Sequence, residues 1–138
     1  MDNYFKMQIP AKSENEAFAR NTLAAFVLPL SPTVEELNDL KTAVSEVVTN
    51  CVVHAYDGDG SVAIVAEIHD NMLFVTISDN GKGIEDVDKA REPMYTSGGD
   101  ERSGMGFTIM ETFMDSVEIT SSLGQGTSVT MTKSFGVC

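Results

Sequence analysis

The sequence predicts one α+β domain, a two-layer sandwich with helices on one face of a mixed, mostly antiparallel sheet. Alternating apolar segments at 62–68 and 73–77 are separated by a short turn, which indicates a β-hairpin, and 117–122 with 127–134 indicate a second. Two helical patterns precede the first hairpin. The hairpins leave no room for the crossovers of a parallel doubly wound sheet, so that alternative is disfavoured.

The first strand and helix are predicted from alternation and turn signals. Residues 5–9 alternate between apolar and polar and stop at Pro10, which is typical of an edge strand because proline cannot donate to a ladder. Ser13 with Glu16 predicts a capping box, and Pro29 ends the helix that follows. This element should therefore pack one apolar stripe on the sheet.

A second helix is predicted from Thr33 to about Ala55. Thr33 and Glu36 repeat the capping-box pattern. Apolar residues then recur at spacings of three and four, as the buried stripe of a helix does. They are Leu37, Leu40, Val44, Val47, Val48 and Cys51.

The remaining chain is divided by glycines and polar residues. The first hairpin turns at 69–72 and delivers Asp79 to a strand end. Residues 81–103 are polar and contain Gly98-Gly99, which predicts a loop. A helix is expected at 107–113, before the final hairpin. We expect a single domain over 1–138, since 138 residues bury about two-thirds of their unfolded surface.

Composition limits the partners. The chain has 9 basic and 21 acidic residues and a formal charge of −12, which argues against nucleic acid or an anionic membrane as a direct partner. A basic protein is the expected partner. No apolar stretch approaches the roughly 18 residues that span a bilayer, and two cysteines make no disulfide framework. A cytoplasmic protein is expected.

Glu46 and Asn50 lie one turn apart on the second helix, so both side chains can face one external point. The asparagine oxygen is a suitable ligand for Mg²⁺, and the glutamate can accept a proton from an attacking hydroxyl. The alternative is a pair of solvated residues on an amphipathic helix.

Asp79 begins the run Asp-Asn-Gly-Lys-Gly after a buried strand. Its carboxylate can accept a hydrogen bond from an exocyclic amine such as that of adenine, whereas guanine offers a carbonyl there. Gly81 would supply the backbone conformation, and Gly83 would keep a base pocket free of a side chain. The alternative is a plain turn.

Gly104, Met105 and Gly106 precede an apolar helix. Unpaired backbone N–H groups at that helix start can bind phosphate oxygens, and Arg102 would add positive charge. A simple join between loop and helix is the alternative, because a lone Gly-x-Gly is a weak signal.

The three motifs together, at 45–56, 78–84 and 104–107, resemble the Bergerat-type ATP-binding fold of histidine kinases, type II topoisomerase ATPase subunits and mismatch-repair proteins. The resemblance covers about 33–132. Within that superfamily the chain is most similar to the small bacterial anti-sigma factor kinases of sporulation. A truncated histidine-kinase catalytic domain is less favoured, since no region carries a phosphoacceptor histidine.

The resemblance implies a role for each motif and a mobile lid at 84–103. By resemblance, the catalytic base is Glu46 and the Mg²⁺ ligand is Asn50. Asp79 and Gly83 hold adenine with support from Thr127, and Gly104 and Gly106 line the phosphates.

The implied function is partner switching. With ATP and Mg²⁺ the protein would bind and inhibit a sigma factor, and as a serine kinase it would phosphorylate and inactivate the anti-anti-sigma factor. The resemblance also implies a homodimer and a docking role for Arg20 at a protein interface. The alternative is a binding module in which nucleotide sets conformation without phosphoryl transfer. Retention of Glu46 beside Asn50 favours the enzyme, because a sensor needs no base.

Overall fold

The computed structural model describes residues 2–55, 60–79, 110–122 and 126–135. The elements follow one another along the chain as β1 (Asn3–Pro10), α1 (Asn15–Phe26), η1 (Leu28–Leu30), α2 (Val34–Asn50), η2 (Cys51–Ala55), β2 (Ser61–His69), β3 (Met72–Asp79), β4 (Ser116–Ser122) and β5 (Gly126–Ser134). Of these, η1 is a 3₁₀ turn, and η2 is a π-helical turn that continues α2.

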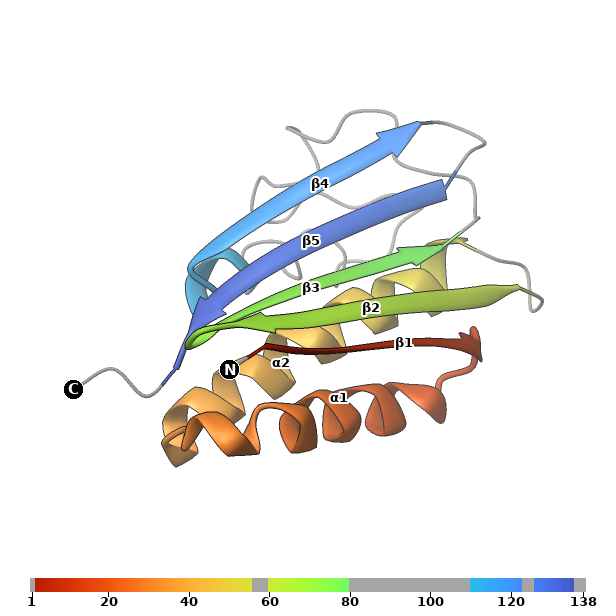
Figure 1. Ribbon diagram of the computed structural model, residues 1–138. Helices are drawn as coiled ribbons and strands as arrows, with labels where there is room; N and C mark the ends of the chain where they lie inside the picture. Colours follow the sequence, from red (N-terminus) through yellow and green to blue (C-terminus); the bar gives the residue numbers. More distant parts are fainter. Residues whose placement is uncertain (1, 56–59, 80–109, 123–125, 136–138) are drawn as a thin grey trace.

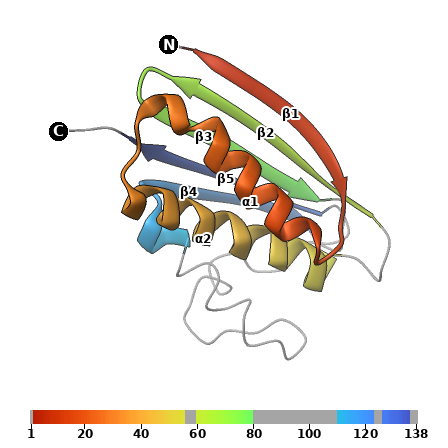
Figure 2. The ribbon, with the colours of Figure 1, turned by 90° about the horizontal axis from the view of Figure 1, so that it is seen from below.

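The five strands form one sheet in the order β1-β2-β3-β5-β4, and each neighbouring pair is antiparallel. Figure 1 shows α1 and α2 beneath this sheet, and Figure 2 shows them side by side on the same face. The predicted two-layer α+β sandwich is therefore confirmed. The sheet was predicted to be mixed and mostly antiparallel, and all of its neighbouring described strands are antiparallel.

The core lies between the sheet and the helices. Alternate residues of β2 and β3 are buried on the helix side, because successive strand side chains point to opposite faces. The helices contribute the predicted stripe. Core residues with at most 1% exposure from these elements include Leu23, Leu40, Val44, Val47, Ile64, Val75 and Ile77.

β1 is an edge strand that ends at Pro10, as predicted. The ring of Phe5 packs edge-on against Phe26 of α1, with ring centroids 4.8 Å apart. This aromatic contact connects the edge of the sheet to the first helix.

The predicted capping box at the start of α1 is wrong. Glu14 occupies the N-cap position with helical φ −65° and ψ −22°, and no side chain caps the helix. A capping residue needs an extended backbone, but the chain already turns at Lys12 and Ser13, whose carbonyl oxygens accept from Asn15 and Glu16. The Glu16 carboxylate instead pairs with Arg20, one turn later on α1.

The capping box of α2 is confirmed. The Glu36 N–H donates to Thr33 Oγ1 at 3.0 Å, and the Thr33 N–H donates to Glu36 Oε1 at 2.8 Å. Together α2 and η2 end at Ala55, which agrees with the predicted boundary. The hairpin of β2 and β3 is confirmed too, with Asp70 at φ 57° in its two-residue turn.

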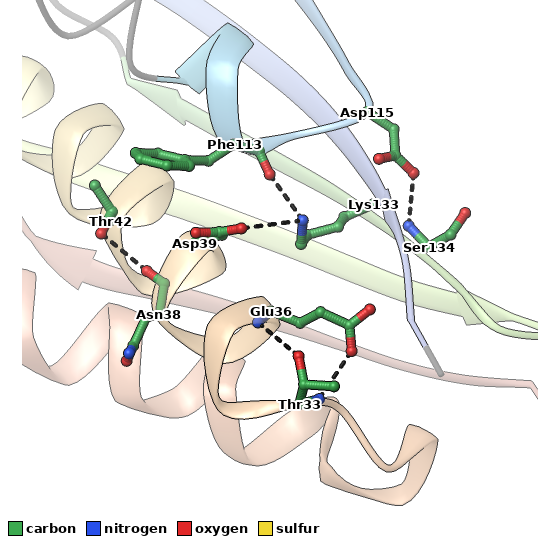
Figure 3. A network of polar contacts seen from close by, with 9 residues as sticks. All are labelled: Thr33, Glu36, Asn38, Asp39, Thr42, Phe113, Asp115, Lys133 and Ser134. Carbon is green, nitrogen blue, oxygen red and sulfur yellow. Dashed lines mark hydrogen bonds and ion pairs between the residues drawn. The ribbon is translucent and has the colours of Figure 1, made fainter. Parts of the chain in front are cut away.

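A buried lysine connects three elements at the N-terminal end of α2 (Figure 3). Lys133 of β5 is 8% exposed, and its Nζ donates to the carbonyl oxygen of Phe113 at 2.8 Å. The same Nζ lies 3.9 Å from Asp39 Oδ2 on α2. Because Phe113 ends a helical segment, Lys133 both caps that segment and attaches it to α2.

No helix in the described parts of the chain is long and apolar enough to cross a bilayer.

Candidate functional site

The candidate site lies where four chain segments meet at one end of the sandwich. The last turns of α2 continue into η2, which contacts both β3 and β5. Figure 1 shows the ends of α2 and β3 and the beginning of β5 on the same side of the molecule. The fold thereby brings together segments that are far apart in the sequence.

Glu46 and Asn50 lie on the last two turns of α2, both partly exposed, beside the buried residues Val47 and Val48. The buried valines hold this side of the helix against the sheet. The carboxylate and the amide therefore lie one turn apart on one side of the helix, next to its buried face.

The amide nitrogen of Asn50 is buried and has no hydrogen-bond partner among the described residues. A buried N–H group without a partner is unfavourable, and such groups often mark functional sites. The residue as a whole is partly exposed, and its side chain also carries the amide oxygen Oδ1. A neutral oxygen donor of this kind fits a hard cation such as Mg²⁺.

Asp79 ends β3, as predicted, and is 9% exposed. Its Oδ1 accepts a hydrogen bond from the backbone N–H of Thr127 on β5 at 3.3 Å. The two residues are 48 positions apart, and the sheet brings them together because β5 pairs with β3. A nearly buried carboxylate at a strand end is suited to accept a hydrogen bond from a bound group.

Cys51 is a residue of this site that sequence reasoning missed. It is 4% exposed at the start of η2, next to Asn50 in the sequence. Burial raises the pKa of the Cys51 thiol, and the adjacent Asp79 charge raises it further. The only signal in the sequence is that Cys51 directly follows Asn50, and its apolar spacing alone indicates a core residue.

Arg20 lies on α1, which is not one of the segments that carry Asp79, Thr127 and Asn50. Arg20 and Glu46 nevertheless line one surface hollow of about 290 Å³ between α1 and α2. Its other lining residues are Asn38, Lys41, Thr42 and Ser45. The predicted docking residue thus borders the same hollow as the predicted base, and its guanidinium is paired with Glu16.

The glycine motifs and the lid lie outside the described residues. This applies to Gly81, Gly83, Arg102, Gly104, Met105, Gly106 and residues 84–103. Within the described ranges, no group of three or more His, Cys, Asp or Glu side chains is placed to hold a metal ion.

Comparison with known proteins identifies the family of this chain. Residues 9–133 match the family profile of the histidine kinase-like ATPase domain. The chain is 53% identical to an anti-sigma F factor of Clostridium beijerinckii, over 99% of this chain and 97% of that protein. It is 54% identical to an anti-sigma F factor of Clostridium perfringens, over 96% and 97% of the two chains.

Solved structures show the same fold at lower identity. The structure of the RsbU and RsbW domains of a Mycobacterium tuberculosis protein matches with a TM-score of 0.69 at 19% identity, over 96% of this chain and 32% of that one. The mycobacterial sensor histidine kinase MprB matches with a TM-score of 0.61 at 14% identity, over 95% and 98%. The chain therefore belongs to the histidine kinase-like ATPase domain family and, within it, to the anti-sigma F factors.

Proposed function

We propose that this protein is a Mg-ATP-dependent anti-sigma factor and serine kinase. With ATP it binds and inhibits a sporulation sigma factor, and it phosphorylates a serine of the anti-anti-sigma factor that would release that sigma factor. The observation that carries the proposal is 51–54% identity to proteins named anti-sigma F factor, over nearly the whole of both chains.

Adenine recognition is proposed for the cluster at the strand ends. Asp79 would accept a hydrogen bond from the exocyclic amine of the base, while the Thr127 N–H holds one oxygen of that carboxylate at 3.3 Å. Gly81 and Gly83, which follow Asp79 in the sequence, would leave room for the base. The burial of Asp79 supports this role, because competing water is largely excluded from its oxygens.

Phosphate binding is proposed for the second glycine motif. The backbone N–H groups at Gly104, Met105 and Gly106 would bind phosphate oxygens, and Arg102 would add charge. Asn50 Oδ1 would hold Mg²⁺, and a bound Mg²⁺ ion would neutralise the charge that develops on the phosphates.

Phosphoryl transfer is proposed to depend on Glu46. Its carboxylate would accept the proton of the substrate serine hydroxyl while the serine oxygen forms a bond to the γ-phosphorus. The bond between the γ-phosphorus and the bridging oxygen breaks, and ADP leaves with that oxygen. The position of Glu46 in an open hollow beside α1 supports access by a protein substrate.

The proposed partners are proteins. Arg20 would contact a partner at the rim of the hollow that contains Glu46. The protein is proposed to act as a homodimer in the cytoplasm, without direct contact to nucleic acid or membrane, in keeping with its charge of −12.

The Glu46→Gln protein tests the proposed reaction. Glutamine keeps the size of the side chain but cannot take up the proton, so we expect ATP affinity within a few-fold of the wild type. Transfer of labelled phosphate to the anti-anti-sigma factor should fall by a factor of roughly 10² to 10⁴. Glu35→Gln, on the exposed first turn of α2, is the matched control and should transfer normally.

Undiminished transfer by Glu46→Gln would refute the role of this residue. A wild-type protein that binds the sigma factor with ATP but transfers no phosphate would instead establish the binding-module alternative. Calorimetric titration with ATP, ADP and GTP, with and without Mg²⁺, tests the nucleotide site separately. We expect ATP binding that depends on Mg²⁺ and little affinity for GTP.

A further inference from the structure

We propose that a furrow between α1 and α2 binds the protein substrate as an extended segment around its acceptor serine. An acidic residue of that segment lies at Lys41 and an aliphatic residue lies at Val53, on opposite sides of the serine at Glu46. The inference rests on the proposed kinase activity and adds to it the chemical class of the segment that is recognised.

The furrow consists of two adjoining hollows on the surface of the helix layer. The first is the hollow of about 290 Å³ that contains Arg20 and Glu46. The second, of about 240 Å³, is lined by Ser13, Glu16, Thr49, Val52 and Val53. Glu16 and Arg20 form an ion pair, and each of them lines a different hollow, so the hollows adjoin at this pair. Figure 2 shows the two helices side by side along this face.

The α2 helix sets the order of the side chains along the furrow. Lys41 precedes Glu46 by five residues, which is about 7.5 Å along the helix axis. Val53 follows Glu46 by seven residues, or about 10 Å. Since an extended chain rises about 3.3 Å per residue, these spans correspond to about two residues on one side of a serine at Glu46 and about three on the other.

Lys41 is the cation of the furrow that is left for an incoming carboxylate. The Arg20 guanidinium is paired with Glu16, whereas the Lys41 side chain has no ion pair or hydrogen bond within the described residues. Lys41 also precedes Asn50 by about 13 Å along the helix, away from the proposed Mg²⁺ position. In a chain with 21 acidic and 9 basic residues, an unpaired lysine in the hollow of Glu46 attracts a negatively charged group.

The other end of the furrow is apolar. Val53 is one of the large apolar side chains that the structure leaves exposed, and Val52 beside it is partly exposed. An aliphatic side chain placed over Val53 would remove apolar surface of both groups from water, which favours binding. The two ends of the furrow therefore select different residue types.

The middle of the furrow suits the backbone of an extended segment. Thr42, Ser45 and Thr49 place hydroxyl groups between the two ends. Thr42 Oγ1 donates to the carbonyl oxygen of Asn38 at 2.8 Å, so its lone pairs remain to accept from a peptide N–H. An extended segment has N–H and C=O groups to offer to such partners, whereas a helix has used its own internally.

The first test measures transfer of labelled phosphate from ATP to the anti-anti-sigma factor as the substrate concentration is varied. Lys41→Gln removes one ion pair, so we expect its KM for the protein substrate to rise three- to fivefold, about the contribution of an exposed pair, with kcat within twofold. Lys41→Arg keeps the charge and should keep KM within about twofold. Lys6→Gln, at an exposed position of β1, is the control for loss of one positive charge.

The possible outcomes separate the inference from the proposed function. An unchanged KM for Lys41→Gln, or an equal rise for Lys6→Gln, would overturn the inference and leave the kinase activity in place. A fall in kcat alone would also overturn it, because Lys41 would then act in the transfer step. A wild-type protein that transfers no phosphate would overturn the proposed function and the inference with it.

The second test locates the acidic residue on the substrate. Mass spectrometry of the phosphorylated anti-anti-sigma factor identifies the serine, and we expect an aspartate or glutamate within three residues of it. Changing that residue to lysine should raise KM, and Lys41→Glu should bring KM for this changed substrate back toward the original value. Losses that simply add, or a serine with no acidic residue within three positions, would overturn the inference.

The third test concerns the apolar end of the furrow. Val53→Thr keeps the branched shape but replaces a methyl group with a hydroxyl group. We expect KM for the protein substrate to rise about threefold while KM for ATP stays unchanged. Val34→Thr, at the exposed start of α2, is the matched control and should change neither value. Equal KM values for Val53→Thr and the wild type would refute the role of this end.

Discussion

Replacing Asp79 with asparagine tests adenine recognition at a single atom. Asparagine has nearly the shape of aspartate, but one carboxylate oxygen becomes an amide N–H₂ group. The remaining oxygen can still accept from the Thr127 N–H, which lies 3.3 Å from Oδ1 in the structure. The substitution therefore keeps the link between β3 and β5 and removes the charged acceptor proposed for the base.

The size of the effect follows from the burial and the charge of this group. A hydrogen bond to a charged acceptor contributes about 1.5–3 kcal/mol, so ATP should bind roughly 10- to 150-fold more weakly. Stability should change in a different way. Asp79 is 9% exposed, and a neutral amide removes the cost of desolvating a carboxylate. The protein without nucleotide should therefore unfold within about 1 kcal/mol of the wild type, or at higher denaturant.

The assay is calorimetric titration with ATP and GTP at fixed Mg²⁺, with urea unfolding of the same samples. Asp70→Asn is the matched control: it removes one acidic charge in the exposed turn before β3, where asparagine also tolerates the positive φ of 57°. We expect the control to bind ATP normally. ATP affinity within twofold of the wild type for Asp79→Asn would refute the assignment of Asp79 to the base.

Three further predictions concern stability and docking. Lys133→Met should lower the free energy of unfolding by about 1–3 kcal/mol, because a buried carbonyl oxygen loses its donor. The control Lys6→Met, at an exposed position, should change it by less than about 0.5 kcal/mol; urea unfolding measures both variants, and equal effects would refute the buried contact. Thr33→Ala should cost about 1 kcal/mol by the same assay through loss of the α2 cap, and an unchanged midpoint would contradict the capping role. Arg20→Glu should weaken binding of the protein partners, whereas Glu16→Gln, which breaks the same ion pair but keeps the arginine, should not. Titration of each variant with the partners measures the affinity, and normal binding by Arg20→Glu would refute the docking role.

Local patterns were sufficient for most of the fold. The stripe of α2 and its capping box are set by spacings of three and four residues, and both hairpins are set by alternation around short turns. The prediction failed at Ser13 for a local reason too. Its pattern matches a capping box, but Glu14, at the N-cap position, already has a helical backbone, and residue types alone do not specify that conformation.

The site depended more on tertiary structure. The sequence placed Asp79 at a strand end, but its contact with Thr127 spans 48 residues and follows only from the pairing of β3 with β5. Cys51 could not be found from periodicity, because a thiol that faces the core and one that faces Asp79 have the same spacing along the helix. The Glu16 partner of Arg20, by contrast, follows from their separation of four residues and could have been predicted.

The first turns of α2 contribute to the stability of the domain, whereas its last turns carry Glu46 and Asn50. Changes at the two ends should therefore affect stability and ATP affinity separately. The helix has 17 residues and is therefore about 25 Å long. Its first turns are fixed by the cap and by the ion pair of Asp39 with Lys133, whereas Glu46 and Asn50 lie on its last turns. Buried residues such as Val44 hold the middle against the sheet. Loss of the Lys133 contact should therefore lower the stability of the whole domain and leave ATP affinity within about twofold, since mutations more than about 10 Å apart act nearly independently. A large fall in ATP affinity at unchanged stability for Lys133→Met would instead mean that α2 transmits changes from one end to the other.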